Sequence, residues 1–187
     1  MRKTLTILSV LIILLSSSSF TLIELNSGNK KASQENELIL GEFKLEDLKS
    51  TNNKAWFEDG YKNYSPKTEV VNKIASVVEN KDFKISVYMG TWCEDSQREF
   101  PGFIKILDQI NFNYKNLTLI GVDEDKIVPN ITNEERRELN VFNVPTIIIY
   151  DKNGKEINRF VEFPQETLEK DLLKIFSRQD YKHVYDF

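Results

Sequence analysis

The chain has 187 residues, 40% of them hydrophobic, and a net charge of −4 from 25 basic and 29 acidic residues. This length is enough for one well-packed domain after a leader is set aside, and the mild acidity without runs of like charge excludes nucleic-acid binding as a function class. The single cysteine, Cys93, rules out an intrachain disulfide, so the fold must be stabilised by its core.

Residues 1–23 have the composition of an export signal. Two basic residues precede an apolar run from Leu5 to Leu15, and Ser16 to Ser19 supplies small residues of the kind that signal peptidases accept. We expect cleavage near Ser19; an uncleaved membrane anchor and a buried element of the domain are the alternatives. A lipoprotein anchor is excluded, because no cysteine stands at the cleavage point.

A polar linker and an N-terminal helical extension are predicted next. Residues 24–37 are polar, without aromatic residues or periodicity, which is typical of a tether, and the domain is expected to span residues 38–187. Residues 45–64 carry apolar side chains at loosely helical spacing. Ser65 followed by Pro66 predicts the start of a further helix, with an apolar face between Val70 and Val78.

From residue 82 onward, predicted strands and helices alternate. The apolar runs 83–89 and 117–123 flank a helical pattern over 96–110, which predicts a parallel β-α-β unit. A short charged helix is expected at 133–139. Two β-rich runs on either side of Asn153 and Gly154 predict a hairpin, and the apolar spacing from Leu168 to Phe176 predicts a closing helix.

Three landmarks in this pattern resemble the thioredoxin family over about residues 82–176. They are the Trp92-Cys93-x-x-Ser96 stretch, Pro101 in the following helix, and the downstream Val144-Pro145-Thr146 stretch. The resemblance implies an α/β thioredoxin fold, β-α-β plus β-β-α around a mixed central sheet, after the N-terminal helical extension. It also implies a cis bond before Pro145 and makes Val144, Pro145 and Thr146 the substrate-binding residues, with Val144 in backbone contact; a trans proline opening an edge strand is the alternative.

The expected chemistry centres on Cys93. At the start of a helix, the dipole and the unpaired N–H groups favour a thiolate; the alternative is an inert buried cysteine. Ser96 replaces the second thiol of the family motif. It can donate a hydrogen bond to Cys93 but forms no disulfide, and an ordinary first-turn serine is its alternative. The expected catalytic residues are therefore Cys93, Ser96 and Trp92. Trp92 is expected to form an apolar wall beside the thiol, and core packing is its alternative.

Further departures from the family concern charge around the cysteine. Val87 and Leu119 stand where thioredoxins often carry an aspartate and a lysine that serve the resolving thiol, so this proton-transfer pair is missing together with the second thiol. Glu94 and Asp95 would oppose ionisation of a nearby thiol, in competition with the helix dipole. The alternative, preferred for Glu94, is that both are favourable first-turn residues that face solvent. His183, the sole histidine, has no ligand cluster at metal-binding spacing in the sequence and receives no metal or base role.

The leading hypothesis is an exported, TlpA-like thiol-disulfide exchange protein in the periplasm or cell envelope of a bacterium. It would act as a reductase or isomerase through one cysteine, as a monomer without a cofactor. Its partners would be disulfide- or thiol-bearing envelope proteins and an external reducing thiol, with membrane contact only through an uncleaved N-terminal segment. The main alternative is a redox-inactive peptide-binding module. An iron–sulfur site is disfavoured, because the C-G-F-S motif is missing, and so is a peroxidase, because no threonine stands three residues before Cys93.

Overall fold

A computed structural model of the chain describes residues 37–187; the predicted leader, and all of the predicted linker except Glu37, lie outside the described residues. A five-stranded sheet has the order β1-β3-β2-β4-β5. Its strands are β1 (Gly41–Phe43), β2 (Lys84–Met89), β3 (Leu117–Gly121), β4 (Thr146–Tyr150) and β5 (Glu156–Val161). β2 and β3 run parallel, whereas the other neighbouring pairs are antiparallel. The predicted mixed sheet is therefore present.

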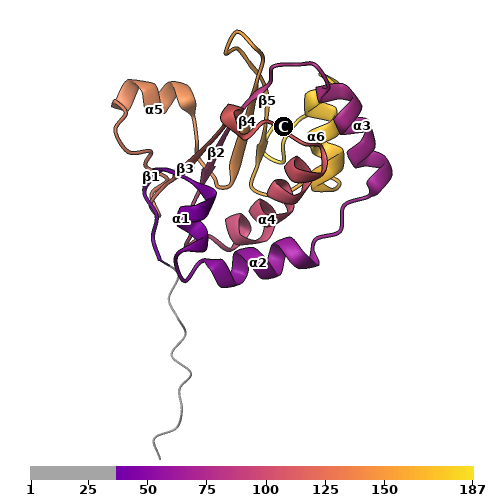
Figure 1. Ribbon diagram of the computed structural model, residues 1–187. Coiled ribbons are helices and arrows are strands. Elements are labelled where there is room, and N and C mark those ends of the chain that lie inside the picture. The colour runs from indigo at the N-terminus through magenta and orange to yellow at the C-terminus, as the bar shows by residue number, and fades with distance from the viewer. Residues whose placement is uncertain (1–36) are drawn as a thin grey trace, which may run out of the picture. The chain divides into compact units, whose positions relative to one another are not determined.

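The helices cover both faces of this sheet. They are α1 (Leu45–Lys49), α2 (Lys54–Asn63), α3 (Thr68–Val78), α4 (Glu94–Gln109), α5 (Asn133–Leu139) and α6 (Leu168–Phe176), with a 3-10 turn η1 (Tyr114–Asn116) before β3. Figure 1 shows α2, α3, α4 and α6 gathered together and α5 set apart from them. Among residues 37–187, no helix has the length and apolar character needed to cross a membrane.

Alternation along the strands divides the core into two apolar clusters. In β2, Val87 lies in the cluster on the α4 side and Tyr88 in the cluster on the α5 side. The side chains predicted to form the apolar face of α4 are buried in the cluster that holds Val87: Phe100, Phe103, Ile104, Leu107 and Ile110. Val87 is in register with Leu119 of β3, and the two are only 0% and 4% exposed. The positions of the missing proton-transfer pair are thus filled by apolar core.

The N-terminal extension contains three helices, α1, α2 and α3, where the sequence predicted a helical pattern over 45–64 and a further helix after it, but it begins with an unpredicted strand. β1 pairs antiparallel with β3, so the extension adds an edge to the sheet. A strand of three residues is too short to show the alternation by which strands are predicted. Glu37 also belongs to the folded part, because its carbonyl accepts hydrogen bonds from Asn53 (2.7 Å) and from Thr91 (2.8 Å).

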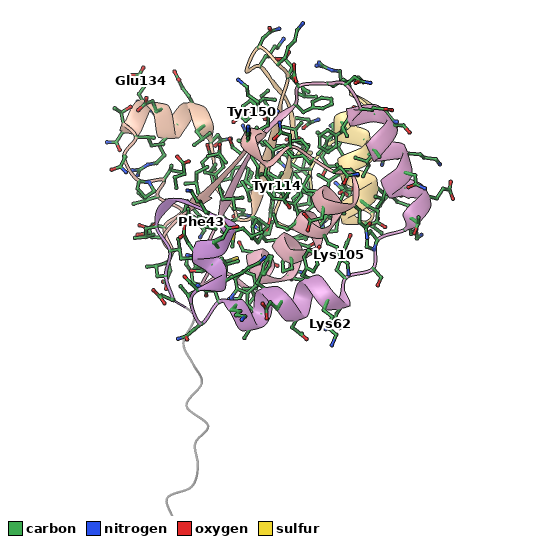
Figure 2. The ribbon with its side chains drawn as sticks, viewed as in Figure 1. Phe43, Lys62, Lys105, Tyr114, Glu134 and Tyr150 are labelled. Atoms are coloured by element: carbon green, nitrogen blue, oxygen red, sulfur yellow. The ribbon has the colours of Figure 1, made fainter. Side chains whose placement is uncertain are left out.

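The extension braces α4. Lys105 of α4 donates from Nζ to the carbonyls of Lys62 (3.2 Å) and Tyr64 (2.6 Å) at the end of α2, and Figure 2 labels Lys105 and Lys62. A cation is stabilised there, since the last carbonyls of a helix lack helical partners. Phe57 of α2 packs on Phe100 of α4 with ring centroids 5.9 Å apart. Contacts with α2 therefore stabilise the position of α4, the helix that begins after Cys93.

The predicted start of α3 is wrong. Ser65 and Pro66 precede the helix, and the N-cap is Lys67, whose side chain makes no capping hydrogen bond. The Lys67 amide instead donates to the carboxylate of Glu169 in α6 at 3.4 Å. A contact with a distant helix thus sets the boundary, and a local cap signal cannot reveal it.

The predicted hairpin is confirmed, with a longer loop than its two central residues suggested. Residues 151–155 join β4 to β5, and Gly154 adopts a φ of 81° that favours glycine. The Asp151 carboxylate accepts hydrogen bonds from the amides of Asn153 (2.9 Å) and Lys155 (3.0 Å), and these bonds lower its pKa. The turn is therefore held by its own side chain.

Gly121 allows the chain before β1 to cross β3 closely, because an added Cβ would overlap the Ile39 carbonyl. We predict that Gly121→Ala lowers the free energy of unfolding by about 2 kcal/mol, within the range usual for overpacking. Chemical denaturation measures this loss. Glu42→Ala, at an exposed position of β1, should change it by less than about 0.5 kcal/mol. Equal stabilities of the two variants would contradict the close crossing.

Candidate active site

Cys93 is the N-cap of α4, at the end of the turn that leaves β2. Its carbonyl accepts the first helical hydrogen bond, from the Gln97 amide at 3.0 Å. The sulfur makes no capping hydrogen bond to the helix. It instead donates to the carbonyl of Val144 at 3.3 Å. Cys93 thus begins the helix as predicted, but its sulfur is turned toward the segment before β4 rather than toward the helix N–H groups.

That segment, residues 142–146, is here called the cis-proline loop. The bond between Val144 and Pro145 is cis, as predicted. The Thr146 hydroxyl donates to the carbonyl of Asn143 at 2.6 Å, which closes the loop. Val144, Pro145 and Thr146 are all buried, so their side chains belong to the fold. Within residues 37–187 the Val144 amide has no hydrogen-bond partner, which leaves a main-chain donor beside Cys93.

Trp92 lies in one apolar cluster with Cys93 and Val144. Its indole N–H donates to the Val122 carbonyl at 3.0 Å, and its ring is half-buried. Gly90 makes room for the ring, since a Cβ there would lie 2.5 Å from it. Trp92 therefore packs in the core next to Cys93 in the chain, and its role as a wall beside the thiol stays a prediction.

Ser96 makes no hydrogen bond to Cys93 within residues 37–187. Its side chain is 0% exposed, and its oxygen accepts a hydrogen bond from the Gly90 amide at 3.2 Å. The predicted hydrogen bond to the cysteine is absent from the described chain, because the hydroxyl points to the first residue after β2. Ser96 therefore ties the turn at residues 90–93 to the first turn of α4.

Two carboxylates in the first two turns of α4 share one cation. The Arg98 guanidinium lies 2.5 Å from Asp95 and 2.8 Å from Glu99. Glu99 is buried, and this burial raises its pKa. Glu94, in contrast, is exposed. The Asp95 charge, which was expected to oppose ionisation of the thiol, is therefore paired with a charge of opposite sign.

Glu162 is a site residue that the sequence did not indicate. It follows β5, and its amide donates to the Pro145 carbonyl at 2.8 Å. Its carboxylate accepts hydrogen bonds from the Asn143 side chain at 3.0 Å and from the Tyr185 hydroxyl. Burial, followed by the charge of nearby Asp95, raises the Glu162 pKa. A glutamate at the end of a strand carries no local signal; the pairing of β4 with β5 brings it to the cis-proline loop.

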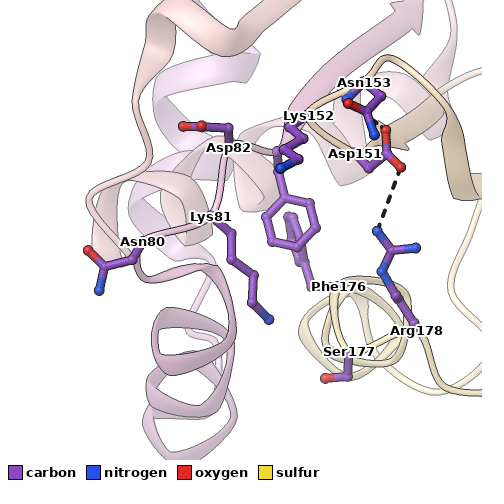
Figure 3. Close-up of a pocket in the computed structure, with 10 residues that line it drawn as sticks. Asn80, Lys81, Asp82, Asp151, Lys152, Asn153, Phe176, Ser177 and Arg178 are labelled. Carbon is purple, nitrogen blue, oxygen red and sulfur yellow. Dashed lines mark hydrogen bonds and ion pairs between the residues drawn. The ribbon is translucent and has the colours of Figure 1, made fainter.

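A pocket of about 480 Å³, drawn in Figure 3, lies away from these residues. It is lined by the turn before β2, the β4–β5 loop and the end of α6: Asn80, Lys81, Asp82, Phe83, Asp151, Lys152, Asn153, Phe176, Ser177 and Arg178. Cys93 follows the opposite end of β2. The pocket is therefore not part of the candidate active site.

A family model described as thioredoxin matches residues 43–177, most of the chain. The chain therefore belongs to the thioredoxin family, and its mixed sheet with flanking helices is a thioredoxin fold. That the Trp92-Cys93-x-x-Ser96 stretch stands at the family's active-site position stays a prediction from the resemblance.

Three solved structures are also similar to the chain. A protein of unknown function from Pseudomonas aeruginosa shares 16% identity, with 66% of this chain and 81% of that one covered and a TM-score of 0.47. An HIV epitope-scaffold shares 16%, with 68% and 83% covered and a TM-score of 0.49. Mitochondrial thioredoxin 3 from Saccharomyces cerevisiae, in its oxidized form, shares 19%, with 54% and 84% covered and a TM-score of 0.29. No curated protein sequence matches the chain. These distant similarities add no argument about function.

We predict that Ser96→Ala lowers the free energy of unfolding by about 1–3 kcal/mol, because the buried Gly90 amide loses its acceptor. Urea denaturation measures the loss. Ser76→Ala is the matched control: that hydroxyl donates to the Asn72 carbonyl at 3.1 Å on an exposed face of α3, and its removal should cost less than about 0.5 kcal/mol. A Ser96→Ala protein as stable as the wild type would show that the turn does not depend on this bond.

Proposed function

We propose that this protein is an exported, TlpA-like thiol-disulfide exchange protein that uses Cys93 as its only nucleophile. The observation that carries the proposal is the position of the half-buried Cys93 sulfur, at the start of α4 and 3.3 Å from the Val144 carbonyl. Export is supported by the composition of residues 1–23 alone. The proposed partners are disulfide- or thiol-bearing proteins of the bacterial envelope.

The proposed reaction has two exchange steps. The Cys93 thiolate attacks one sulfur of a partner disulfide; a new S–S bond forms, the old one breaks, and the other sulfur leaves as a thiolate. Cys93 and the partner are then joined in a mixed disulfide. A second thiolate must attack that bond to release Cys93. If it comes from the partner itself, the net result is isomerisation; if it comes from an external thiol, the partner is reduced and the external thiol is oxidised.

The surroundings of Cys93 support an external second thiol. Ser96 carries a hydroxyl that is bonded to the Gly90 amide and cannot replace a thiolate. Val87 and Leu119 place apolar side chains where the family often has a proton-transfer pair. Nothing at these three positions would release the mixed disulfide from inside the protein.

Main-chain pairing would hold the partner. The unpaired Val144 amide can donate to an extended segment of a bound protein, as in strand addition to a sheet edge. Because the Val144 side chain is buried, side-chain selectivity would come from exposed neighbours. Phe142 in the same loop and Phe163 after β5 are 38% and 42% exposed. These two rings favour a partner segment with apolar side chains near its disulfide.

We predict that the wild-type protein, treated with an unstructured peptide whose single cysteine is disulfide-linked to a small thiol, forms a mixed disulfide with the peptide on Cys93. Because the small thiol leaves and the peptide carries no second thiol, this adduct should persist until a reducing thiol is added. In Ser96→Cys the lifetime of this adduct should fall at least about tenfold, since a thiol in the same helical turn attacks intramolecularly. Intact-mass spectrometry over time measures both lifetimes.

Ser76→Cys is the control, because it adds a thiol on an exposed face of α3, outside the site. It should leave the lifetime of the Cys93 adduct unchanged. If the wild type forms no adduct on Cys93 while the added thiol of Ser76→Cys does, the proposed function is wrong.

A further inference from the structure

The tail after α6, residues 178–187, is anchored along β5 and reaches the cis-proline loop. Tyr181 is 7% exposed; its hydroxyl donates to Asp171 at 3.2 Å, and its carbonyl accepts from the Asn158 side chain at 2.9 Å. His183 is also 7% exposed, and its Nδ1 accepts the amide of Tyr185 at 3.2 Å. These two buried residues fix the place of Tyr185.

Tyr185 meets the cis-proline loop and the end of β5 together. Its ring lies 5.5 Å from that of Phe142, edge to face, and 6.4 Å from that of Phe163. Its hydroxyl donates to the carboxylate of Glu162, which also accepts from the side chain of Asn143. The tail is therefore joined to the loop by aromatic packing and by a shared carboxylate.

Glu162 is held in a backbone conformation that favours glycine. Its φ is 66°, in the left-handed region, which costs free energy for a residue with a Cβ. Such a conformation persists only where the surroundings impose it. Here the amide is bonded to the Pro145 carbonyl, and the carboxylate to Asn143 and Tyr185. All three partners belong to the loop or the tail.

We propose that Glu162, held in place by Tyr185, is a positioning residue that sets the cis-proline loop against Cys93. Glu162 is bonded to both sides of Val144, at 3.0 Å through Asn143 and at 2.8 Å through Pro145. Val144 in turn faces Cys93 at 3.3 Å. The tail thus determines where the Val144 main chain meets a partner peptide. This inference rests on the proposed function for the identity of that peptide.

Two variants and one control test the inference. Tyr185→Phe removes the hydroxyl and keeps the ring. Glu162→Gly removes the carboxylate while leaving a residue that tolerates positive φ, so its backbone is not strained further. Tyr114→Phe is the control, because it removes a hydroxyl–carboxylate bond of 2.7 Å, to Asp108, outside the site.

Two rates are measured for each protein at one pH: alkylation of Cys93 by iodoacetamide, which needs no peptide contact, and mixed-disulfide formation with a peptide disulfide. The ratio of the peptide rate to the alkylation rate should fall about fivefold or more in Tyr185→Phe and in Glu162→Gly. A misplaced loop would impair docking of the peptide more than it impairs access of iodoacetamide to the Cys93 thiol. Tyr114→Phe should keep the wild-type ratio. A merely structural role could change the melting temperature but would leave the ratio unchanged.

Wild-type ratios in both Tyr185→Phe and Glu162→Gly would overturn the positioning role while leaving the proposed function intact. A wild-type protein that is alkylated at Cys93 but forms no mixed disulfide would overturn the proposed function, and the positioning role with it, since no peptide reaction would remain to be positioned.

Discussion

The candidate site depends on one contact, between the Cys93 sulfur and the Val144 carbonyl, which joins segments 51 residues apart in the chain. Sheet register produces it. β2 and β4 pair antiparallel with Tyr88 opposite Thr146, so the turn that leaves β2 and the loop that enters β4 lie at the same end of the two strands. Cys93, which caps the helix that starts in that turn, therefore lies beside the cis-proline loop.

Both sides of this contact are supported by segments outside the central β-α-β and β-β-α units. On the Cys93 side, the N-terminal extension packs on α4, and Glu37 and Ile39 hold Thr91 through hydrogen bonds of 2.8 and 3.3 Å. On the Val144 side, the C-terminal tail reaches Glu162. The N-terminal extension and the C-terminal tail thus each support one side of the site.

What could be predicted from the sequence was local. The helix start at Cys93, the apolar face of α4 and the hairpin near Gly154 each leave a signal within a few residues, and the structure has all three. The cis bond before Pro145 is also present, but only the resemblance to thioredoxins implied it. What could not be predicted depends on long-range pairing: β1 is too short to alternate, Ser96 turns to Gly90, and Glu162 reaches Pro145 only because β5 pairs with β4.

Under the proposed function, Cys93 exchanges disulfides with other proteins and is released by an outside thiol. The most direct measurement is to block free thiols in intact cells that produce the protein, isolate the cell envelope, and identify by mass spectrometry what is disulfide-linked to Cys93. We expect partner proteins that are released by reductant and absent from a Cys93→Ala strain. Recovery of Cys93 only as a blocked free thiol, with no linked partner, would contradict the proposed function.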